Sequence, residues 1–221
     1  MSTTERSRPA WPGLFVTFEG MDGSGKSTQL RLLAQRLRAA GYAVTESAEP
    51  GGTPIGRQIR QLLLDNKNHA LAPTAELLLY FACRAQNVDE WIRPALEAGG
   101  VVLSDRYSDS TRAYQGAARR LGGTVVEELN AIACRGVDPQ VTILVDIDLA
   151  TSYERQKLRP RASDRLESEA QEFYQSVRDE YAQIAAREPE RVRVVDGHGD
   201  VQTVAARIWT VIEPLLPELP V

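Results

Sequence analysis

The chain has 221 residues, a length that suits one domain with a core large enough to fold without disulfides or metals. Hydrophobic residues make up 43% and charged residues 25%, which is a globular composition and argues against disorder. The formal net charge of -4 gives no electrostatic support for binding to nucleic acid or to a membrane surface, so neither is expected as a partner.

The ends and the cysteines suggest where such a domain works. Residues 1–12 are polar and lack the apolar stretch of a secretory signal, so we expect a disordered lead-in followed by a single domain over residues 13–221. No apolar run approaches the roughly 20 residues of a membrane span. Cys83 and Cys134 form no C-x-x-C pair, which predicts reduced core thiols in a cytoplasmic protein.

The first predicted element is the apolar strand Leu14–Phe18, followed at once by the glycine-rich stretch Gly20–Ser27. This stretch fits G-x-x-x-x-G-K-[ST], a loop whose backbone N–H groups surround phosphate oxygens while the lysine reaches the outer phosphates. Leu30, Leu33 and Leu37 then predict a helix, whose N-terminal dipole attracts the same anions. Strand and helix are the context that this motif requires, so we expect a nucleotide phosphate site. Its expected members are Gly20, Asp22, Gly23, Ser24, Gly25, Lys26, Ser27 and Thr28.

The second predicted strand, Tyr42–Ala48, ends in the turn-forming stretch Glu49–Pro54. Loops at the carboxyl ends of strands are where open α/β sheets bind ligands. Apolar spacing then predicts a helix over 55–65 and a longer one over 73–98. Arg84 interrupts the apolar surface of the longer helix. The sequence leaves open whether Arg84 is a solvated side chain on the outer face or part of a site.

The short apolar run Val101–Leu103 predicts a third, fully buried strand. Asp105 and Arg106 follow it and should lie at the edge of the sheet that carries the phosphate loop. Because Mg²⁺ takes oxygen ligands, Asp105 and the hydroxyl of Ser27 are its expected contacts. Arg106 can bind a phosphate through two parallel hydrogen bonds. The alternative is a local ion pair between the two neighbours, which we disfavour because this strand and the phosphate loop converge.

Further strand and helix patterns complete the domain. They predict a helix over 125–133, a strand over 141–145, a helix from 149 behind the N-cap residue Asp148, a helix over 168–188, a strand over 191–195 and a final helix behind Asp200. The order of elements predicts an α/β fold of the P-loop type, with a five-stranded parallel sheet and helices on both faces.

Arginines crowd the segment 155–165, which is broken by Pro160 and runs into an acidic stretch. A charge run is usually a solvated face. This one lies where a strand–helix unit should be compact, so we favour a lid over about residues 155–166 that closes over phosphates and excludes water.

The polar residues favour a kinase acting on a small acceptor over a GTP switch. The nearest match to a guanine-binding Asn-Lys-x-Asp motif, Asn66–His69, has histidine where the aspartate should be. A nucleoside monophosphate needs no general base, because the second pKa of a phosphate monoester is about 6, and the sequence offers no evident base. The reaction still needs alignment of the substrates and neutralisation of charge in the transition state, which Lys26, Mg²⁺ and several arginines can provide.

Several stretches in this order resemble the thymidylate kinase family. They are Phe18–Thr28, Glu49–Thr53, Arg84–Gln86, Asp105–Tyr107 with Ala113–Gly116, and Asp164–Arg165 followed by Glu167. The resemblance runs from about residue 15 to residue 196 and implies phosphorylation of dTMP to dTDP by ATP, Mg²⁺ as cofactor and a homodimer packed through helices. The alternatives are another nucleoside monophosphate kinase, with dUMP, UMP or AMP as acceptor, and a non-catalytic nucleotide-binding module.

The resemblance also implies roles for residues at matching positions. Asp22 corresponds to the carboxylate on the sugar 3'-hydroxyl side of dTMP, Arg106 to the clamp on its phosphate and Arg84 to the group that binds the thymine edge. Tyr80 stands in place of the usual phenylalanine that stacks on the base. The full expected dTMP site is Asp22, Glu49, Tyr80, Arg84, Arg106, Thr111, Tyr114 and Gln115.

Family members without arginine in the phosphate loop resemble this chain, which has Gly23 at that position, and supply a catalytic arginine from the lid. The lid candidates are Arg159, Arg161 and Arg165, which join Lys26 and Arg106 as expected catalytic residues. The chain departs from the family pattern at two places. Ala48 stands where relatives often have arginine, and Pro160 occupies the usually glycine-rich centre of the lid.

Overall fold

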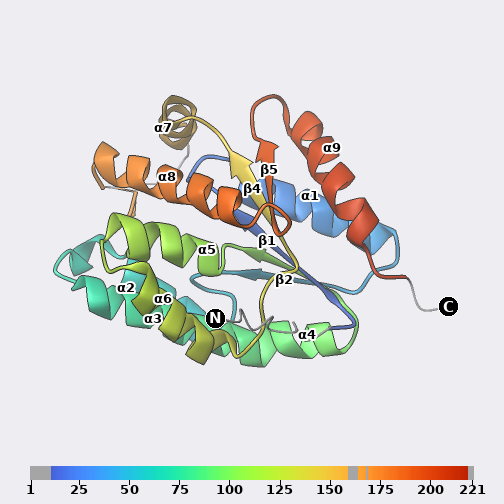
Figure 1. The fold of residues 1–221 in the computed structure, drawn as a ribbon, viewed down its shortest axis with the longest axis horizontal. Helices are drawn as coiled ribbons and strands as arrows, with labels where there is room; N and C mark the ends of the chain where they lie inside the picture. Colours follow the sequence, from blue (N-terminus) through green and yellow to red (C-terminus); the bar gives the residue numbers. More distant parts are fainter. Residues whose placement is uncertain (1–10, 159–163, 168, 219–221) are drawn as a thin grey trace, which may run out of the picture.

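A parallel sheet of five strands organises the molecule, and the computed structural model describes residues 11–158, 164–167 and 169–218 of the chain (Figure 1). The strands are β1 (Leu14–Glu19), β2 (Val44–Ala48), β3 (Val101–Asp105), β4 (Val141–Asp146) and β5 (Val192–Asp196). Their order is β2-β3-β1-β4-β5, and every pairing is parallel. The predicted sheet is therefore confirmed, and all its carboxyl ends meet at one edge.

Helices account for most of the remaining described chain. They are α1 (Lys26–Ala39), α2 (Pro54–Leu64), α3 (Pro73–Asn87), α4 (Arg93–Glu97), α5 (Ser108–Thr111), α6 (Gly123–Cys134), α7 (Leu149–Lys157), α8 (Gln171–Arg187) and α9 (Val201–Ile212). Two π-helical segments, η2 (Val88–Ile92) and η3 (Arg112–Ala118), link α3 to α4 and extend α5, and the short 3₁₀ turns are η1 (Asn66–Asn68) and η4 (Glu213–Leu215).

The helix boundaries follow local chemistry. The predicted helix over 73–98 is one run interrupted by the π-helical turn η2. Both predicted N-caps are confirmed: the Asp148 carboxylate accepts from the backbone N–H of Thr151, and the Asp200 carboxylate from those of Gln202 and Thr203. None of the helices in the described chain combines the length and the apolar character needed to cross a membrane.

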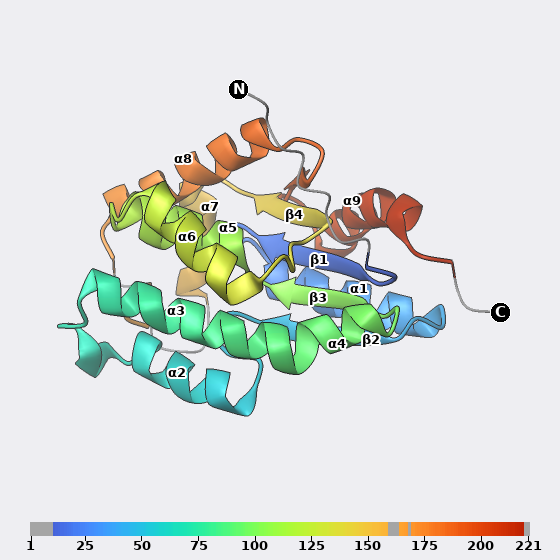
Figure 2. The ribbon, with the colours of Figure 1, turned by 60° about the horizontal axis from the view of Figure 1, so that its bottom comes forward.

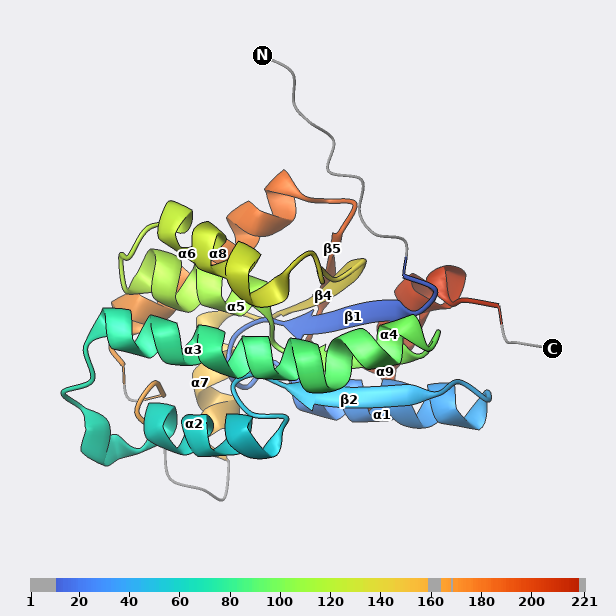
Figure 3. The ribbon, with the colours of Figure 1, turned by 90° about the horizontal axis from the view of Figure 1, so that it is seen from below.

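Helices cover both faces of the sheet, as Figures 2 and 3 show. Alternate residues of β1 divide between the two cores, because successive strand side chains point to opposite faces. Val16 packs with α1 and α9 on one face, and Phe15 packs with the α3–η2–α4 run on the other. Trp11, the first residue described from the predicted lead-in, packs against the second core.

Polar side chains replace apolar ones along part of this second face. Thr17 and Glu19 of β1 point the same way as Phe15, and both are fully buried. Thr17 shares a hydrogen bond of 2.7 Å with Thr142 on β4. Buried polar groups need partners, so this row predicts a hydrogen-bonded network beneath the carboxyl edge of the sheet.

Candidate active site

The glycine-rich loop between β1 and α1 has the backbone conformation that its sequence demands. Gly20, Gly23 and Gly25 all have positive φ, and a Cβ on Gly20 would lie 2.4 Å from the carbonyl oxygen of Val145. A Cβ on Gly23 would lie 2.8 Å from the carbonyl oxygen of Ser152 on α7. A larger residue at the Gly23 position is thus opposed by both its conformation and its neighbours.

Lys26 is the first residue of α1, and it is buried beneath the loop. Its Nζ donates to the carbonyl oxygen of Met21 at 2.8 Å, which holds the ammonium group under the loop. Burial, reinforced by the nearby positive charge of Arg106, lowers the pKa of Lys26 to about 8. An anion bound in the loop would restore the preference for the charged form.

Ser27 and Asp105 come together at the carboxyl edge from α1 and β3, and the Ser27 hydroxyl donates to the Asp105 carboxylate. Two neighbouring oxygen donors match the ligand preference of Mg²⁺, which keeps several waters and takes further ligands from substrate phosphates. Within the described residues there is no cluster of three or more His, Cys, Asp or Glu side chains able to hold a metal ion. The donor set therefore fits Mg²⁺ held jointly with phosphates.

Arg106 lies between the loop and the rest of the site, with its own φ at +73°. Its Nη2 donates to the Asp22 carboxylate at 2.8 Å, and its Nη1 donates to Ser110 Oγ at 3.0 Å and to the Tyr181 hydroxyl at 3.2 Å. The centroid of the Tyr114 ring lies 4.9 Å from the guanidinium carbon. These contacts fix the guanidinium group at the boundary of two pockets.

Arg84 is not a solvated arginine, because its side chain is 1% exposed. It forms an ion pair of 2.8 Å with the equally buried Glu49 and donates to Thr111 Oγ1 at 2.8 Å. Burial raises the pKa of Glu49, and the Arg84 charge opposes this. Removing either partner would leave a buried charge without its counter-ion, which is strongly destabilising. Of the two alternatives that the sequence left open, Arg84 is therefore the buried one, and it lines a pocket.

Two pockets open side by side here. The loop pocket, of about 490 Å³, is lined by the glycine-rich loop together with Lys26, Ser27 and Asp105. The inner pocket, of about 90 Å³, is lined by mixed polar and aromatic side chains that include Tyr80, Arg84, Thr111, Tyr114 and Gln115. The residues shared by both linings are Asp22, Glu49, Pro50, Arg60 and Arg106.

Most of the residues expected from sequence thus gather around these two pockets. The exceptions are the loop residues Gly20 and Ser24, which line neither pocket, and the lid arginines. Arg159 and Arg161 lie outside the described residues. Arg165 is described, but it lines neither pocket: its guanidinium group bonds the carboxylate of Glu76 on α3 at 2.5 Å and the carbonyl oxygen of Leu63 at 2.8 Å.

Some residues around the pockets were not anticipated from sequence. Arg57 and Arg60, on successive turns of α2, line the loop pocket together with Ala48. Arg155 of α7 donates to the carbonyl oxygen of Gly23 at 3.4 Å. Arg57 and Arg60 occupy helical positions that resemble those of ordinary surface arginines, so no sequence signal separated them from solvated ones, whereas Arg155 begins the segment predicted as a lid.

Glu19 is the central acceptor of the buried network beneath Arg106. Its carboxylate accepts from the Tyr107 backbone N–H at 2.7 Å, from Ser110 Oγ at 2.5 Å and from the Tyr181 hydroxyl at 2.8 Å. Burial raises the pKa of Glu19 to about 7, the negative charge of Asp109 adds to the rise, and Arg106 and the hydrogen bonds oppose it.

We predict that this carboxyl group makes folding pH-dependent. Since its folded pKa of about 7 exceeds its ordinary value of 4.5, the native state binds more protons than the unfolded state between these limits. The free energy of unfolding should therefore fall as pH rises through that window, by an amount on the order of 3 kcal/mol. Urea unfolding of the wild type and Glu19→Gln at a series of pH values measures this, and the slope should be smaller in the variant.

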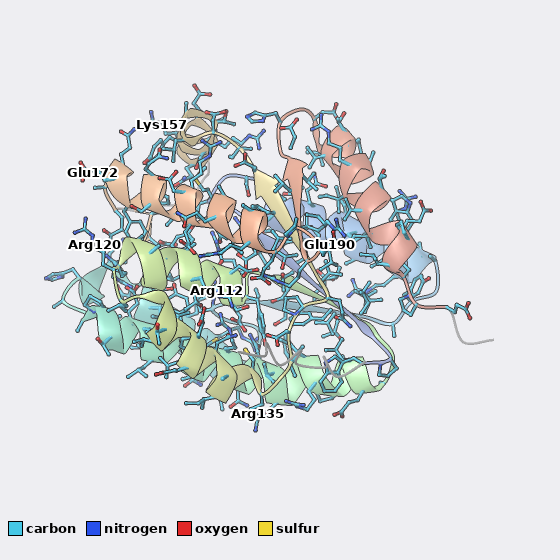
Figure 4. All side chains as sticks on the ribbon, in the orientation of Figure 1. Arg112, Arg120, Arg135, Lys157, Glu172 and Glu190 are labelled. Atoms are coloured by element: carbon cyan, nitrogen blue, oxygen red, sulfur yellow. The ribbon has the colours of Figure 1, made fainter. Side chains whose placement is uncertain are left out.

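The matched control for this experiment is Glu172→Gln, which changes an exposed glutamate at the outer end of α8 (Figure 4). It should keep the wild-type slope. Parallel slopes for the wild type and Glu19→Gln would contradict the assignment.

Comparisons with known proteins agree on one family. The family profile described as "Thymidylate kinase" matches residues 18–208. A thymidylate kinase from Citrifermentans bemidjiense is 52% identical over 195 residues, covering 86% of this chain and 87% of the relative, and one from Pelobacter propionicus is 46% identical over 202 residues, covering 89% and 92%. The crystal structure of thymidylate kinase from Ehrlichia chaffeensis matches with a TM-score of 0.76 at 32% identity, covering 91% of this chain and 98% of that one.

Proposed function

The chain belongs to the thymidylate kinase family, and from this premise we propose how its two pockets perform the phosphorylation of dTMP to dTDP by ATP. The ATP phosphates bind in the loop pocket and dTMP binds in the inner pocket. The observation that carries this assignment is that Arg106 and Asp22 line both pockets, so an acceptor phosphate at their junction lies next to the donor phosphates.

The inner pocket has groups for each part of dTMP. Arg84 offers donors to a base carbonyl, Tyr80 offers a ring face and Arg106 offers a guanidinium group to the phosphate. Asp22 lies at the pocket junction, where it can accept from the sugar hydroxyl.

In the reaction, an oxygen of the dTMP phosphate forms a bond to the γ-phosphorus of ATP. The bond from that phosphorus to the bridging oxygen breaks, and ADP leaves with its electron pair. The dianionic acceptor supplies its own nucleophile, so the chain needs no general base. Lys26 and Arg106 neutralise charge on the two sides of the transferred group. When bound by Ser27 and Asp105, Mg²⁺ would supply further neutralisation of the ATP phosphates.

A lid arginine completes the set. Because Arg165 is engaged by Glu76, we assign this role to Arg159 or Arg161. Turnover numbers of the two single alanine variants would separate these candidates, and a normal kcat in both would refute the assignment.

The experiment that tests the function is product formation from dTMP, dUMP, dCMP, AMP and UMP with ATP and Mg²⁺. Efficient use of dTMP is expected, with no product after EDTA treatment and recovery on addition of Mg²⁺. A preference for AMP or UMP would assign the chain to another monophosphate kinase. Binding of ATP without turnover of any acceptor would favour a nucleotide-binding module.

A homodimer is supported by exposed apolar side chains on the adjoining helices α2, α3 and α6. Leu78 on α3 is 51% exposed and Ile132 on α6 is 71% exposed, and Ile55 and Leu62 of α2 are similarly open. Burying such side chains against a second copy is favourable. Leu78→Glu should give a monomer in sedimentation velocity experiments. Val194→Glu, a control on the edge strand β5, should stay dimeric, and an unchanged dimer in the first variant would contradict this surface.

A cytoplasmic location is supported by the two cysteines. Cys83 and Cys134 are both buried free thiols, which suit a reducing compartment. Cell fractionation with an antibody against the chain would test this location.

A further inference from the structure

A buried carboxylate of α3 lies behind the inner pocket without lining it. Glu76 is fully buried, and it accepts from Gln115 Nε2 at 2.9 Å, from Arg119 Nε at 3.3 Å and from Arg165 Nη2 at 2.5 Å. Burial alone would raise the pKa of Glu76, but the hydrogen bonds from Gln115 and Arg165 and the charge of Arg119 outweigh it and lower the pKa. Glu76 is therefore an ionised group that can accept hydrogen bonds and cannot donate.

This property decides the orientation of the Gln115 side chain. An amide has one donating end and one accepting end, and only the Nε2 end can bond an ionised carboxylate. With Nε2 held by Glu76, the other end of the amide is Oε1, to which no group in the described part of the chain donates. Gln115 lines the inner pocket, so Oε1 is an acceptor available to a ligand there.

The ring nitrogen at position 3 distinguishes the pyrimidine bases. Thymine and uracil carry a hydrogen on it and carbonyl groups beside it, whereas cytosine has a bare acceptor nitrogen there and an amino group at position 4. The fixed acceptor of Gln115 matches the N3–H of thymine, and the donors of Arg84 match the carbonyl at position 4. Against cytosine, both protein groups would face a group of their own kind, which costs a buried hydrogen bond at each place.

We propose that Glu76 is a positioning residue for base selection, which holds Gln115 as an acceptor and so favours a pyrimidine with a hydrogen on N3 over cytosine. This inference rests on the proposed placement of the base in the inner pocket. Glu76 does not contact the substrate itself, and it acts through the Gln115 amide, which does.

The same carboxylate ties this amide to the C-terminal end of the proposed lid. Glu76 Oε1 binds Gln115 while Oε2 binds Arg165, and Leu166 packs beside Tyr80 in the wall of the inner pocket. A substitution of Glu76 therefore affects both the orientation of the Gln115 amide and the packing of Leu166 against Tyr80. The test must separate these two effects.

The test measures kcat/KM for dTMP and for dCMP with wild type and variants. In Glu76→Gln the new amide can donate as well as accept, so Gln115 can reverse, and the dTMP to dCMP ratio should fall by about tenfold or more. In the double variant Glu76→Gln/Gln115→Glu, the new carboxylate accepts from the new amide and presents its second oxygen to N3–H. The ratio should then recover. Arg119→Gln removes a cation from Glu76 without touching Gln115, so it should keep the wild-type ratio.

Each outcome separates this inference from its premise. A wild type without preference for dTMP would overturn the placement of the base. A wild-type ratio in a folded Glu76→Gln variant, or a lowered ratio that the double variant fails to restore, would overturn the role of Glu76 alone. Should Glu76→Gln fail to fold, Gln115→Met removes the acceptor at similar size, and an unchanged ratio in that variant also overturns the inference.

Discussion

Replacing Lys26 with alanine is expected to lower kcat by about a hundredfold to a thousandfold, with a smaller change in the KM for either substrate. The ammonium group is fixed beneath the loop by the Met21 carbonyl, so it meets developing phosphate charge without having to reorganise. Steady-state kinetics with varied ATP and dTMP measure the effect. Lys67→Ala, which removes an exposed lysine from the turn η1, is the matched control and should have normal kinetics.

The pH dependence of the wild type provides an independent test of the same group. Because the pKa of Lys26 is lowered to about 8, the free enzyme loses this charge as pH rises through that value, and kcat/KM for ATP should fall. Bound phosphates favour the charged ammonium, so kcat should stay constant to higher pH. A turnover close to normal in Lys26→Ala, or a kcat/KM that is flat across pH 8, would contradict the role of the lysine.

The parts of the site whose geometry follows from local rules were predictable from the sequence. The phosphate loop is defined by its glycines and flanking elements, and the parallel sheet brings Asp105 to the same edge because Phe18 and Asp105 are register partners. The sequence alone therefore predicted that Ser27 and Asp105 lie together, and the two side chains are hydrogen-bonded in the structure. Fold and family were predictable for the same reason, since each motif is a short segment with its own context.

Long-range polar partners were not predictable. Arg84 could not be separated from a solvated arginine, because its counter-ion Glu49 lies in a turn 35 positions away. The sequence placed Arg165 among the catalytic candidates, whereas its partner Glu76 is 89 positions away and holds its guanidinium group outside both pockets. Glu19 and Glu76 carry no motif signal of their role, since a buried carboxylate is recognised only by the donors that three-dimensional packing brings to it.

Arg106 is the second residue whose loss should be severe, and its effect should differ in kind from that of Lys26. Arg106→Ala is expected to raise the KM for dTMP and to lower kcat together, with kcat/KM for dTMP falling by about a thousandfold, because the side chain binds the acceptor both before and during transfer. Arg106→Lys should recover only part of this, since an ammonium group restores the charge without the paired hydrogen bonds.

The control for Arg106 is Arg112, six positions further along the chain and labelled in Figure 4, which pairs with Asp109 and Glu188 and lines neither pocket. Arg112→Ala should leave the KM for dTMP and kcat close to normal. Because Arg106 borders both pockets, the effects of Arg106→Ala on the KM for ATP and on the KM for dTMP show which substrate its guanidinium group serves. If Arg106→Ala changed only the affinity for ATP, the guanidinium group would belong to the donor side alone, and the acceptor phosphate would have to be held by another shared residue such as Arg60.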